Sequence, residues 1–255
     1  MVGIHEIFTA TTIIAGLFDK KQINSATGFF FSDTEKNIYL VTNKHIIYGN
    51  NYATSTNPII DQIILNLHTD VNNMGQSEKV TLDLFDKTNK KWLEHKNPFI
   101  DVVLIPINLD RTKYVFLALD ETYLDSENAL IYFEKIFVMG YPYEWYDDVN
   151  NLPITRVGNL SSPFGVPFKG DPYMVGDVET HEGMSGGPVF LDLQDFTVVK
   201  DGGLTTYPGR RKFLLIGIYS GQYEIPHLME RPNLITIWFA DLILQIINSK
   251  SNKKE

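Results

Sequence analysis

Apolar and polar residues alternate along much of the chain with the period of two that is typical of β-strands. In the stretch DQIILNLHTD (residues 61–70), Ile63, Leu65 and Leu67 share one face of an extended chain. The stretch KVTLDLFD (79–86) repeats this alternation. Short alternating runs separated by polar turns predict an antiparallel β-fold.

The chain divides where the alternation is interrupted. DVVLIPIN (101–108) is a continuous apolar run, as expected of a strand that is buried on both faces. Residues 109–133 lack a sustained period and are rich in Asp and Glu, whereas strand-like runs resume from residue 135. We therefore expect two halves, residues 1–118 and 119–255, joined by a connection.

One α-helix is predicted, at the C-terminal end. Apolar residues recur there at the i, i+3, i+4, i+7 and i+8 positions of a helical face. They are Phe239, Leu242, Ile243, Ile246 and Ile247. Many short strands with a single terminal helix indicate an all-β fold, either a pair of barrels or a pair of sandwiches.

Composition excludes several classes of function. The 255-residue chain carries a net charge of −9, which argues against a nucleic-acid partner. It has no cysteine, so disulfides and thiolate nucleophiles are excluded. No apolar run is long enough to span a bilayer, and the N-terminus lacks the basic segment of a signal peptide. We expect a cytoplasmic protein with no membrane partner, no metal site and no cofactor, since metal-ligand spacings and phosphate-binding loops are also missing.

A single serine, Ser185, lies among three glycines in HEGMSGGPVFLDL (181–193). Glycine is favoured where the backbone takes unusual angles or approaches another group closely. The motif matches the nucleophile elbow of α/β-hydrolases, but that elbow requires a helix after the serine. Here Pro188 is followed by a strand pattern, so that fold is excluded. A tight turn and a nucleophile beside open N–H groups both remain possible.

Two further residues have chemistry that could activate a serine. His45, in YLVTNKHII, lies where an apolar strand emerges, and the neighbouring Lys44 is expected to point to solvent. Asp101 opens the buried strand, and a carboxylate at that position needs a partner such as a histidine N–H. The order along the chain is His45, Asp101, Ser185.

These motifs together resemble the chymotrypsin/trypsin-like serine peptidase superfamily, in its cysteine-free bacterial form. The resemblance is carried by TNKH, DVVLIPI and GMSGGPVF, with support from FVMGYP (137–142) and IGIYSG (216–221). It implies two six-stranded antiparallel Greek-key barrels with a C-terminal α-helix, and a site in the crevice between the barrels. His45 and Asp101 would come from the first barrel, and Ser185 from the second.

The resemblance also implies a role for each residue. Ser185 would be the nucleophile of a serine endopeptidase and would form an acyl-enzyme. His45 would move the proton, and Asp101 would orient the imidazole. The backbone N–H groups of Gly183 and Ser185 would form the oxyanion hole, and Ser220 and Gln222 would line the bound protein or peptide substrate.

Specificity depends on the residues that precede the serine. Glu179 lies six residues before Ser185, where trypsin-like members have the acidic floor of the specificity pocket, which predicts cleavage after basic residues. In the alternative, Glu179 lies in solvent, and Thr180 and Tyr219 form a small or neutral pocket.

Met184 stands where digestive members carry an aspartate that receives a newly cut N-terminus. The resemblance therefore implies an enzyme that is competent as synthesised or is switched by an activating partner protein. A second class of function is a catalytically weak or inactive module that binds proteins or peptides on the same fold.

Overall fold

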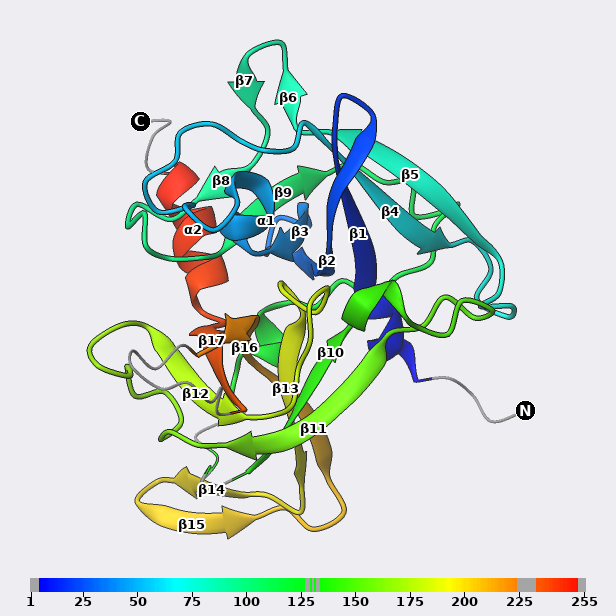
Figure 1. Ribbon diagram of the computed structural model, residues 1–255. Helices are drawn as coiled ribbons and strands as arrows, with labels where there is room; N and C mark the ends of the chain where they lie inside the picture. Colours follow the sequence, from blue (N-terminus) through cyan, green and yellow to red (C-terminus); the bar gives the residue numbers. More distant parts are fainter. Residues whose placement is uncertain (1–4, 127–128, 130, 132–133, 224–232, 252–255) are drawn as a thin grey trace.

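The computed structural model describes residues 5–126, 129, 131, 134–223 and 233–251. Antiparallel strands dominate both halves of the molecule (Figure 1). The strands of the N-terminal half are β1 (Thr11–Phe18), β2 (Lys21–Ser32), β3 (Ile38–Thr42), β4 (Gln62–His68), β5 (Ser77–Asp83), β6 (Phe85–Asp86), β7 (Asn89–Lys90), β8 (Leu93–Glu94) and β9 (Val103–Ile107).

The N-terminal strands form a seven-stranded sheet in the order β5-β4-β1-β2-β3-β9-β8. It has one strand more than expected, because the short β8 pairs with β9 through Leu93 and Glu94. The alternation in β4 is confirmed, since Ile63, Leu65 and Leu67 are all buried. Strands β6 and β7 make a separate hairpin.

The C-terminal half is a closed barrel of six strands in the order β10-β11-β12-β17-β16-β13. A separate hairpin pairs β14 with β15. The strands of this half are β10 (Lys135–Gly140), β11 (Ile154–Leu160), β12 (Tyr173–Asp177), β13 (Pro188–Gln194), β14 (Thr197–Lys200), β15 (Gly203–Thr206), β16 (Arg211–Gln222) and β17 (Leu234–Phe239). The expected all-β fold with a terminal helix is confirmed, and the expected boundary at residues 118 and 119 falls between β9 and β10.

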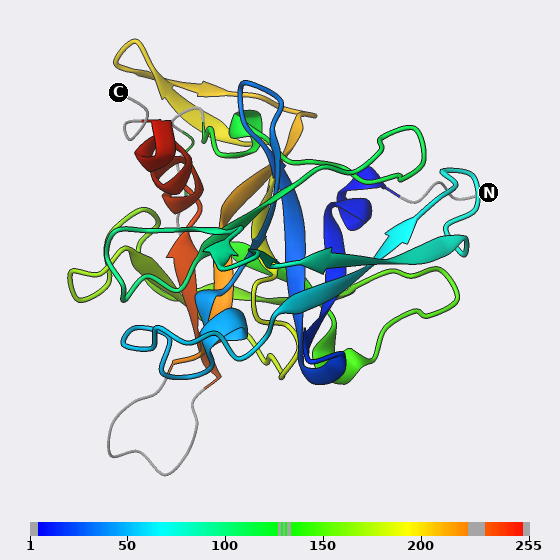
Figure 2. The ribbon, with the colours of Figure 1, turned by 90° about the horizontal axis from the view of Figure 1, so that it is seen from above.

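Short helical segments occur at the ends and in the connections. They are η1 (Glu6–Ala10), α1 (Lys44–Tyr48), η2 (Glu121–Tyr123), η3 (Pro142–Glu144) and α2 (Leu242–Ser251). The predicted terminal helix is α2, which begins at Leu242, because Phe239 is still paired with Gly217 at the end of β17. Helix α2 contacts β8 and β9, so the C-terminal end of the chain packs against the N-terminal sheet (Figures 1 and 2).

The two halves share a hydrophobic core. One cluster of buried side chains combines Phe29 and Val41 from the N-terminal sheet with Phe190, Leu215 and Trp238 from the barrel. Burial of this many large apolar groups fixes the two halves relative to each other. In the described part of the chain, no helix has the length and apolar character needed to cross a membrane.

Candidate active site

His45 lies in the first turn of α1, directly after β3. The sequence predicts a strand end here, but the chain turns into a helix, and the Gly49 N–H donates to the His45 carbonyl at 2.8 Å. Gly49 has a φ of +75°, a left-handed conformation that favours glycine and ends the helix after one turn. Asn43, the residue before the helix, donates through Nδ2 to the Asp101 carbonyl at 2.7 Å. The short helix is therefore tied to the segment that carries Asp101.

Asp101 is 1 % exposed and accepts three hydrogen bonds. Oδ1 accepts from the His45 backbone N–H at 2.8 Å, and Oδ2 lies 2.6 Å from His45 Nδ1. Oδ2 also accepts from Ser220 Oγ at 2.6 Å. These bonds compensate for the burial of the carboxylate. The structure thus brings three of the predicted residues, His45, Asp101 and Ser220, into direct contact.

The contact with Asp101 determines what the imidazole can do. With the proton on Nδ1 directed to the carboxylate, Nε2 keeps its lone pair and can accept a proton. Burial lowers the pKa of His45, but the charge of Asp101 and its hydrogen bond outweigh burial and raise the pKa above 6.5. Tyr52 lies beside the imidazole with the ring centroids 6.4 Å apart, and burial followed by the charge of Asp101 raises its pKa to about 12. The Tyr52 phenol therefore stays neutral next to the imidazole.

Lys44 does not point to solvent as expected. Its side chain is buried, and Nζ lies 3.0 Å from Glu94 Oε2. Tyr48 and Trp92 also donate to Glu94 Oε1, at 2.6 and 2.7 Å. Burial raises the pKa of Glu94, but the hydrogen bonds from Tyr48, Lys44 and Trp92 lower it overall. The expectation is wrong because Lys44 begins a helix rather than ending a strand, and the helix turns its side chain inward.

Ser185 is half-buried in the loop between β12 and β13. Its carbonyl accepts from the Thr27 N–H at 2.9 Å, and the next N–H, of Gly186, donates to the Tyr219 carbonyl at 2.8 Å. Gly186 has a φ of +86°, and a Cβ there would collide with the Thr42 hydroxyl and the Thr27 carbonyl. The serine therefore lies between the end of β3, three residues before His45, and the strand that carries Ser220. In the described part of the chain, Ser185 Oγ makes no hydrogen bond.

Two hydrogen bonds fix the backbone on either side of the Gly183 N–H. Gly183 has a φ of +90°, and its carbonyl accepts from Thr27 Oγ1 at 2.8 Å. The carbonyl before it, of Glu182, accepts from the Tyr143 N–H at 2.7 Å. Because C=O and N–H point in opposite directions across a trans peptide, this bond turns the Gly183 N–H away from Tyr143. Among the described residues, neither the Gly183 nor the Ser185 N–H finds an acceptor.

Glu179 does not form a buried pocket floor. Its side chain is 64 % exposed and lies 2.6 Å from Nη2 of Arg156 on β11. Arg156 Nε also donates to the Glu179 carbonyl at 2.9 Å, and His181 Nε2 lies 3.8 Å from Glu179 Oε1. The expected acidic floor is thus already paired on the surface of the barrel.

The residues next to it in the expected pocket are neutral and buried. Thr180 Oγ1 lies 2.8 Å from Tyr219 Oη, and both side chains are buried. Gln222 Nε2 donates to the Thr180 carbonyl at 3.4 Å. The Gln222 Oε1 atom is buried and has no hydrogen-bond partner in the part of the chain that the structure describes. These groups are two hydroxyls and an amide, and none of them is charged.

The other histidines in the N-terminal half have structural roles. His68 is buried, and its Nδ1 lies 3.0 Å from the Met74 carbonyl. Burial lowers the pKa of His68, as expected of a neutral histidine in a core. His95 Nδ1 accepts from the Asn97 N–H at 3.0 Å in a turn.

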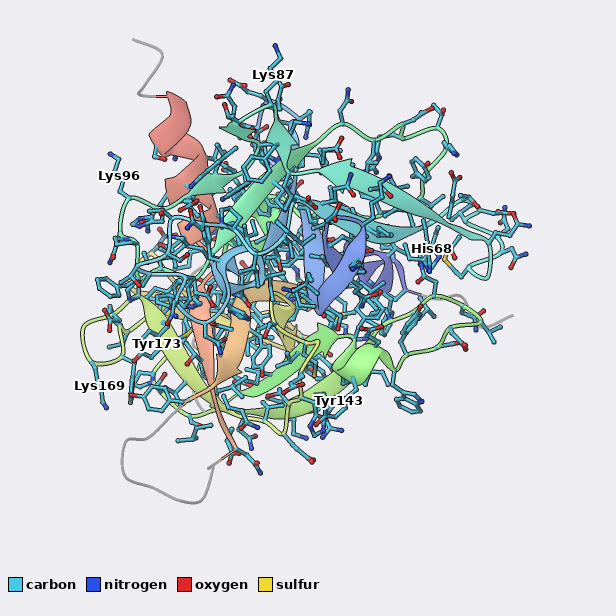
Figure 3. The ribbon with its side chains drawn as sticks, turned by 45° about the horizontal axis from the view of Figure 1, so that its top comes forward. His68, Lys87, Lys96, Tyr143, Lys169 and Tyr173 are labelled. Carbon is cyan, nitrogen blue, oxygen red and sulfur yellow. The ribbon has the colours of Figure 1, made fainter. Side chains whose placement is uncertain are left out.

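Sequence reasoning missed three residues that support the site. Thr27 bonds to the Gly183 carbonyl, Asn43 bonds to the Asp101 carbonyl, and Tyr143 bonds to the Glu182 carbonyl. Figure 3 shows Tyr143 at the edge of the barrel. Each partner is far away in the sequence, so no local pattern marks these residues.

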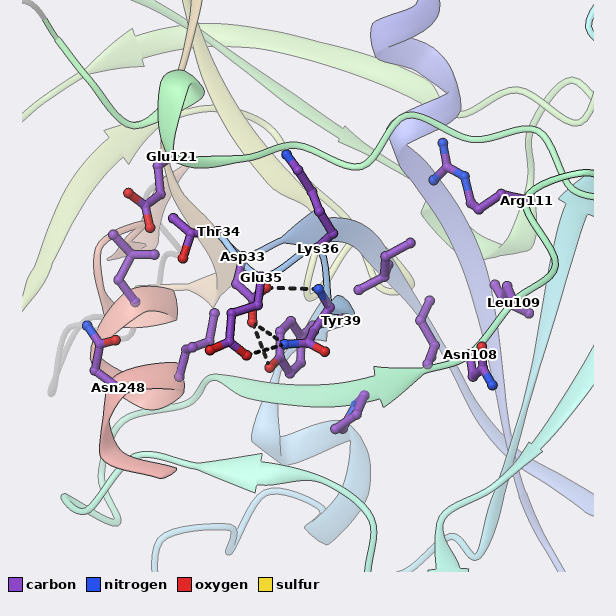
Figure 4. Close-up of a pocket in the computed structure, with 16 residues that line it drawn as sticks. Asp33, Thr34, Glu35, Lys36, Tyr39, Asn108, Leu109, Arg111, Glu121 and Asn248 are labelled. Carbon is purple, nitrogen blue, oxygen red and sulfur yellow. Dashed lines mark hydrogen bonds between the residues drawn. The ribbon is translucent and has the colours of Figure 1, made fainter. Parts of the chain in front are cut away.

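A cavity of about 750 Å³ lies elsewhere, between the β2–β3 turn, the end of β9 and helix α2 (Figure 4). Its lining includes Asp33, Tyr39 and Leu244, and Tyr39 Oη donates to Asp33 Oδ2 at 3.2 Å. None of the candidate catalytic residues lines it, so we do not assign it to the substrate.

Comparison with known proteins bears on the fold and the family. No match was found among curated proteins. Among solved structures, the fold is similar to a thermostable serine protease, AL20, from an extremophilic microorganism, with a TM-score of 0.57 and 11 % identity over 97 % of this chain and 99 % of that one. It is also similar to a serine endoprotease from Yersinia pestis, with a TM-score of 0.53 and 16 % identity over 95 % of this chain.

The chain spans only 62 % of the length of the Yersinia protein. The family model for the trypsin-like peptidase domain matches residues 26–199, which include His45, Asp101 and Ser185. That match extends over more than half of the sequence, and the chain belongs to the family of trypsin-like peptidase domains.

Proposed function

We propose that this domain is a serine endopeptidase in which Ser185, His45 and Asp101 act as a catalytic triad. The observation that carries the proposal is the 2.6 Å contact between His45 Nδ1 and the buried Asp101 carboxylate. A buried carboxylate that holds one imidazole nitrogen leaves the other directed outward as a base. The glycine-flanked serine follows in the order that the family requires.

In the first half of the reaction, Ser185 Oγ attacks the carbonyl carbon of the scissile peptide bond. The hydroxyl proton moves to His45 Nε2, and Asp101 stabilises the imidazolium that results. The negative charge that develops on the substrate oxygen is stabilised by the N–H groups of Gly183 and Ser185. The C–N bond then breaks, and the proton on Nε2 passes to the leaving amine.

The second half of the reaction releases the acyl group. Water replaces the amine, gives a proton to His45 Nε2 and attacks the ester carbon on Ser185. The same two N–H groups stabilise the second oxyanion. When the C–O bond to Ser185 breaks, the proton returns to Oγ, so the enzyme is regenerated.

For specificity, the geometry favours the neutral alternative over cleavage after basic residues. The Glu179 carboxylate is exposed and neutralised by Arg156, so it offers a substrate lysine or arginine little net attraction. The buried groups of the pocket are the Thr180 and Tyr219 hydroxyls. A pocket with hydroxyls and no charge selects a small or polar neutral side chain before the scissile bond.

A fluorogenic peptide library tests the activity. The purified domain should cleave the library, and Ser185→Ala should fold normally but lose about 10⁶ in kcat, as triad serines do elsewhere. Ser161→Ala, which changes an exposed serine on a loop, is the matched control and should leave cleavage unchanged. Equal cleavage by the wild type and Ser185→Ala would contradict the proposal, and no cleavage by a folded wild type would favour a binding module.

A further inference from the structure

The hydrogen bond from the Tyr143 N–H to the Glu182 carbonyl fixes the orientation of the peptide that carries the Gly183 N–H. If that carbonyl lost its donor, the peptide could rotate about its neighbouring bonds and turn the Gly183 N–H away from the substrate. Glycine at position 183 removes the side-chain barrier to such a rotation. The Tyr143 N–H therefore determines how the Gly183 N–H is oriented.

The backbone at Tyr143 is strained. Tyr143 has φ 51° and ψ 28°, and Glu144 has a φ of 57°, so two successive residues with side chains adopt a left-handed conformation. For residues with side chains this conformation is unfavourable, and it persists only where surrounding contacts hold it. It is this conformation that aims the Tyr143 N–H at Glu182.

Side-chain contacts on both sides of the turn add to its backbone hydrogen bonds, which include a 2.7 Å bond from the Trp145 N–H to the Pro142 carbonyl. The Tyr143 ring stacks on His181, with centroids 5.1 Å apart and planes 27° apart, and Tyr143 Oη lies 3.4 Å from His181 Nδ1. On the other side, Gln22 Nε2 donates to Glu144 Oε1 at 2.8 Å. His181 precedes Glu182, so the ring stack and the backbone bond join the same two segments.

We propose that Tyr143 is a positioning residue for catalysis, and that its ring, stacked on His181, keeps the Gly183 N–H directed toward the substrate. This rests on the proposed function, because it assigns the Gly183 N–H to the oxyanion. The ring is 65 % exposed, so its burial adds little to the stability of the fold. Loss of the ring should lower the rate of reaction more than it lowers the free energy of unfolding or the affinity for substrate.

The test uses the full chain and diisopropyl fluorophosphate, whose P=O oxygen gains negative charge as Ser185 attacks. The second-order rate of labelling should fall about 10- to 100-fold in Tyr143→Ala, less than the 10²–10³ expected for complete loss of a donor. Tyr143→Phe keeps the ring and should restore the rate. Trp145→Ala removes an aromatic ring from the same turn that is 71 % exposed and lies outside this stack, and it should match the wild type.

A second variant separates positioning from a general structural role. His181→Ala should slow labelling as Tyr143→Ala does, and the double variant should be little slower than either, because each removes the same stack. Peptide cleavage should show the loss in kcat, with KM nearly unchanged. A wild-type rate in Tyr143→Ala would overturn this inference alone. No labelling of the folded wild type would overturn the proposed function and this inference with it.

Discussion

The hydroxyl of Thr27, on β2 of the N-terminal sheet, donates a 2.8 Å hydrogen bond to the carbonyl of Gly183, beside the candidate nucleophile in the C-terminal half. The same hydroxyl accepts from the Tyr141 N–H at 3.1 Å. One buried side chain thus joins the first half of the molecule to both segments that shape the loop proposed to bind the oxyanion.

Replacing this hydroxyl by a methyl group should lower both the free energy of unfolding and kcat. Thr27→Val keeps the shape but leaves the Gly183 carbonyl and the Tyr141 N–H without a partner, at about 1–3 kcal/mol for each buried group. Urea unfolding should show the loss, and kcat should fall because the Gly183 peptide is less firmly held. Thr27→Ser keeps the hydroxyl and is the control; equal stability of the two variants would contradict this account.

The pH dependence of cleavage should follow the pKa of His45. Burial lowers that pKa and Asp101 raises it more, so kcat/KM of the wild type should rise with pH through a value above 6.5, as the imidazole loses its proton. Asp101→Asn removes the charge that raises the pKa of His45 but leaves the burial that lowers it. The midpoint of the pH–rate profile should therefore shift to lower pH. The rate should fall by about 10⁴, because the imidazole loses its orienting acceptor.

The matched control for this shift is Asp83→Asn, which changes an exposed aspartate on β5. Its pH–rate profile should superimpose on that of the wild type. A midpoint in Asp101→Asn that equals or exceeds the wild-type midpoint would show that Asp101 does not set the pKa of His45.

The buried lysine beside His45 should matter for stability. Lys44→Met keeps most of the apolar stem but removes the ammonium that lies 3.0 Å from Glu94 Oε2. Glu94 then keeps Lys90, 3.6 Å away, and the Tyr48 and Trp92 donors, so the loss should be about 1–2 kcal/mol. Urea denaturation measures the loss. Lys96→Met, at an exposed position in the same region, should be neutral, and a Lys44→Met protein as stable as this control would contradict the assigned ion pair.

Cleavage-site profiling should separate the two pocket models. If the Thr180 and Tyr219 hydroxyls form the pocket, the wild type should prefer small or polar neutral residues, and Glu179→Gln should cut the same sites. A wild type that prefers lysine or arginine, together with loss of that preference in Glu179→Gln, would restore Glu179 as the determinant.

Sequence reasoning succeeded where the signal is local. The glycines around Ser185, the carboxylate that opens a buried strand at Asp101 and the histidine after an apolar run each have a recognisable context, and the structure joins His45 to Asp101 directly. The β4 alternation likewise predicts which residues are buried. These features depend on neighbours within a few positions.

Sequence reasoning failed where a distant residue or a turn determines the position of a side chain. The run KHIIY contains β-branched residues and resembles a strand, but Gly49 closes it into a helix that turns Lys44 inward. Glu179 lies at the expected spacing from Ser185, but Arg156 on β11 holds it at the surface. Thr27 and Tyr143 act through hydrogen bonds to segments far along the chain, which no local pattern reveals.

We propose that His45 activates Ser185. Mass spectrometry of the intact protein and its peptides after reaction with diisopropyl fluorophosphate tests this most directly. We predict one adduct per chain, on Ser185, in the wild type and in the control His95→Ala, and no measurable adduct in His45→Ala or Ser185→Ala. Labelling of folded His45→Ala at the wild-type rate, or an adduct on another residue that persists in Ser185→Ala, would contradict the claim.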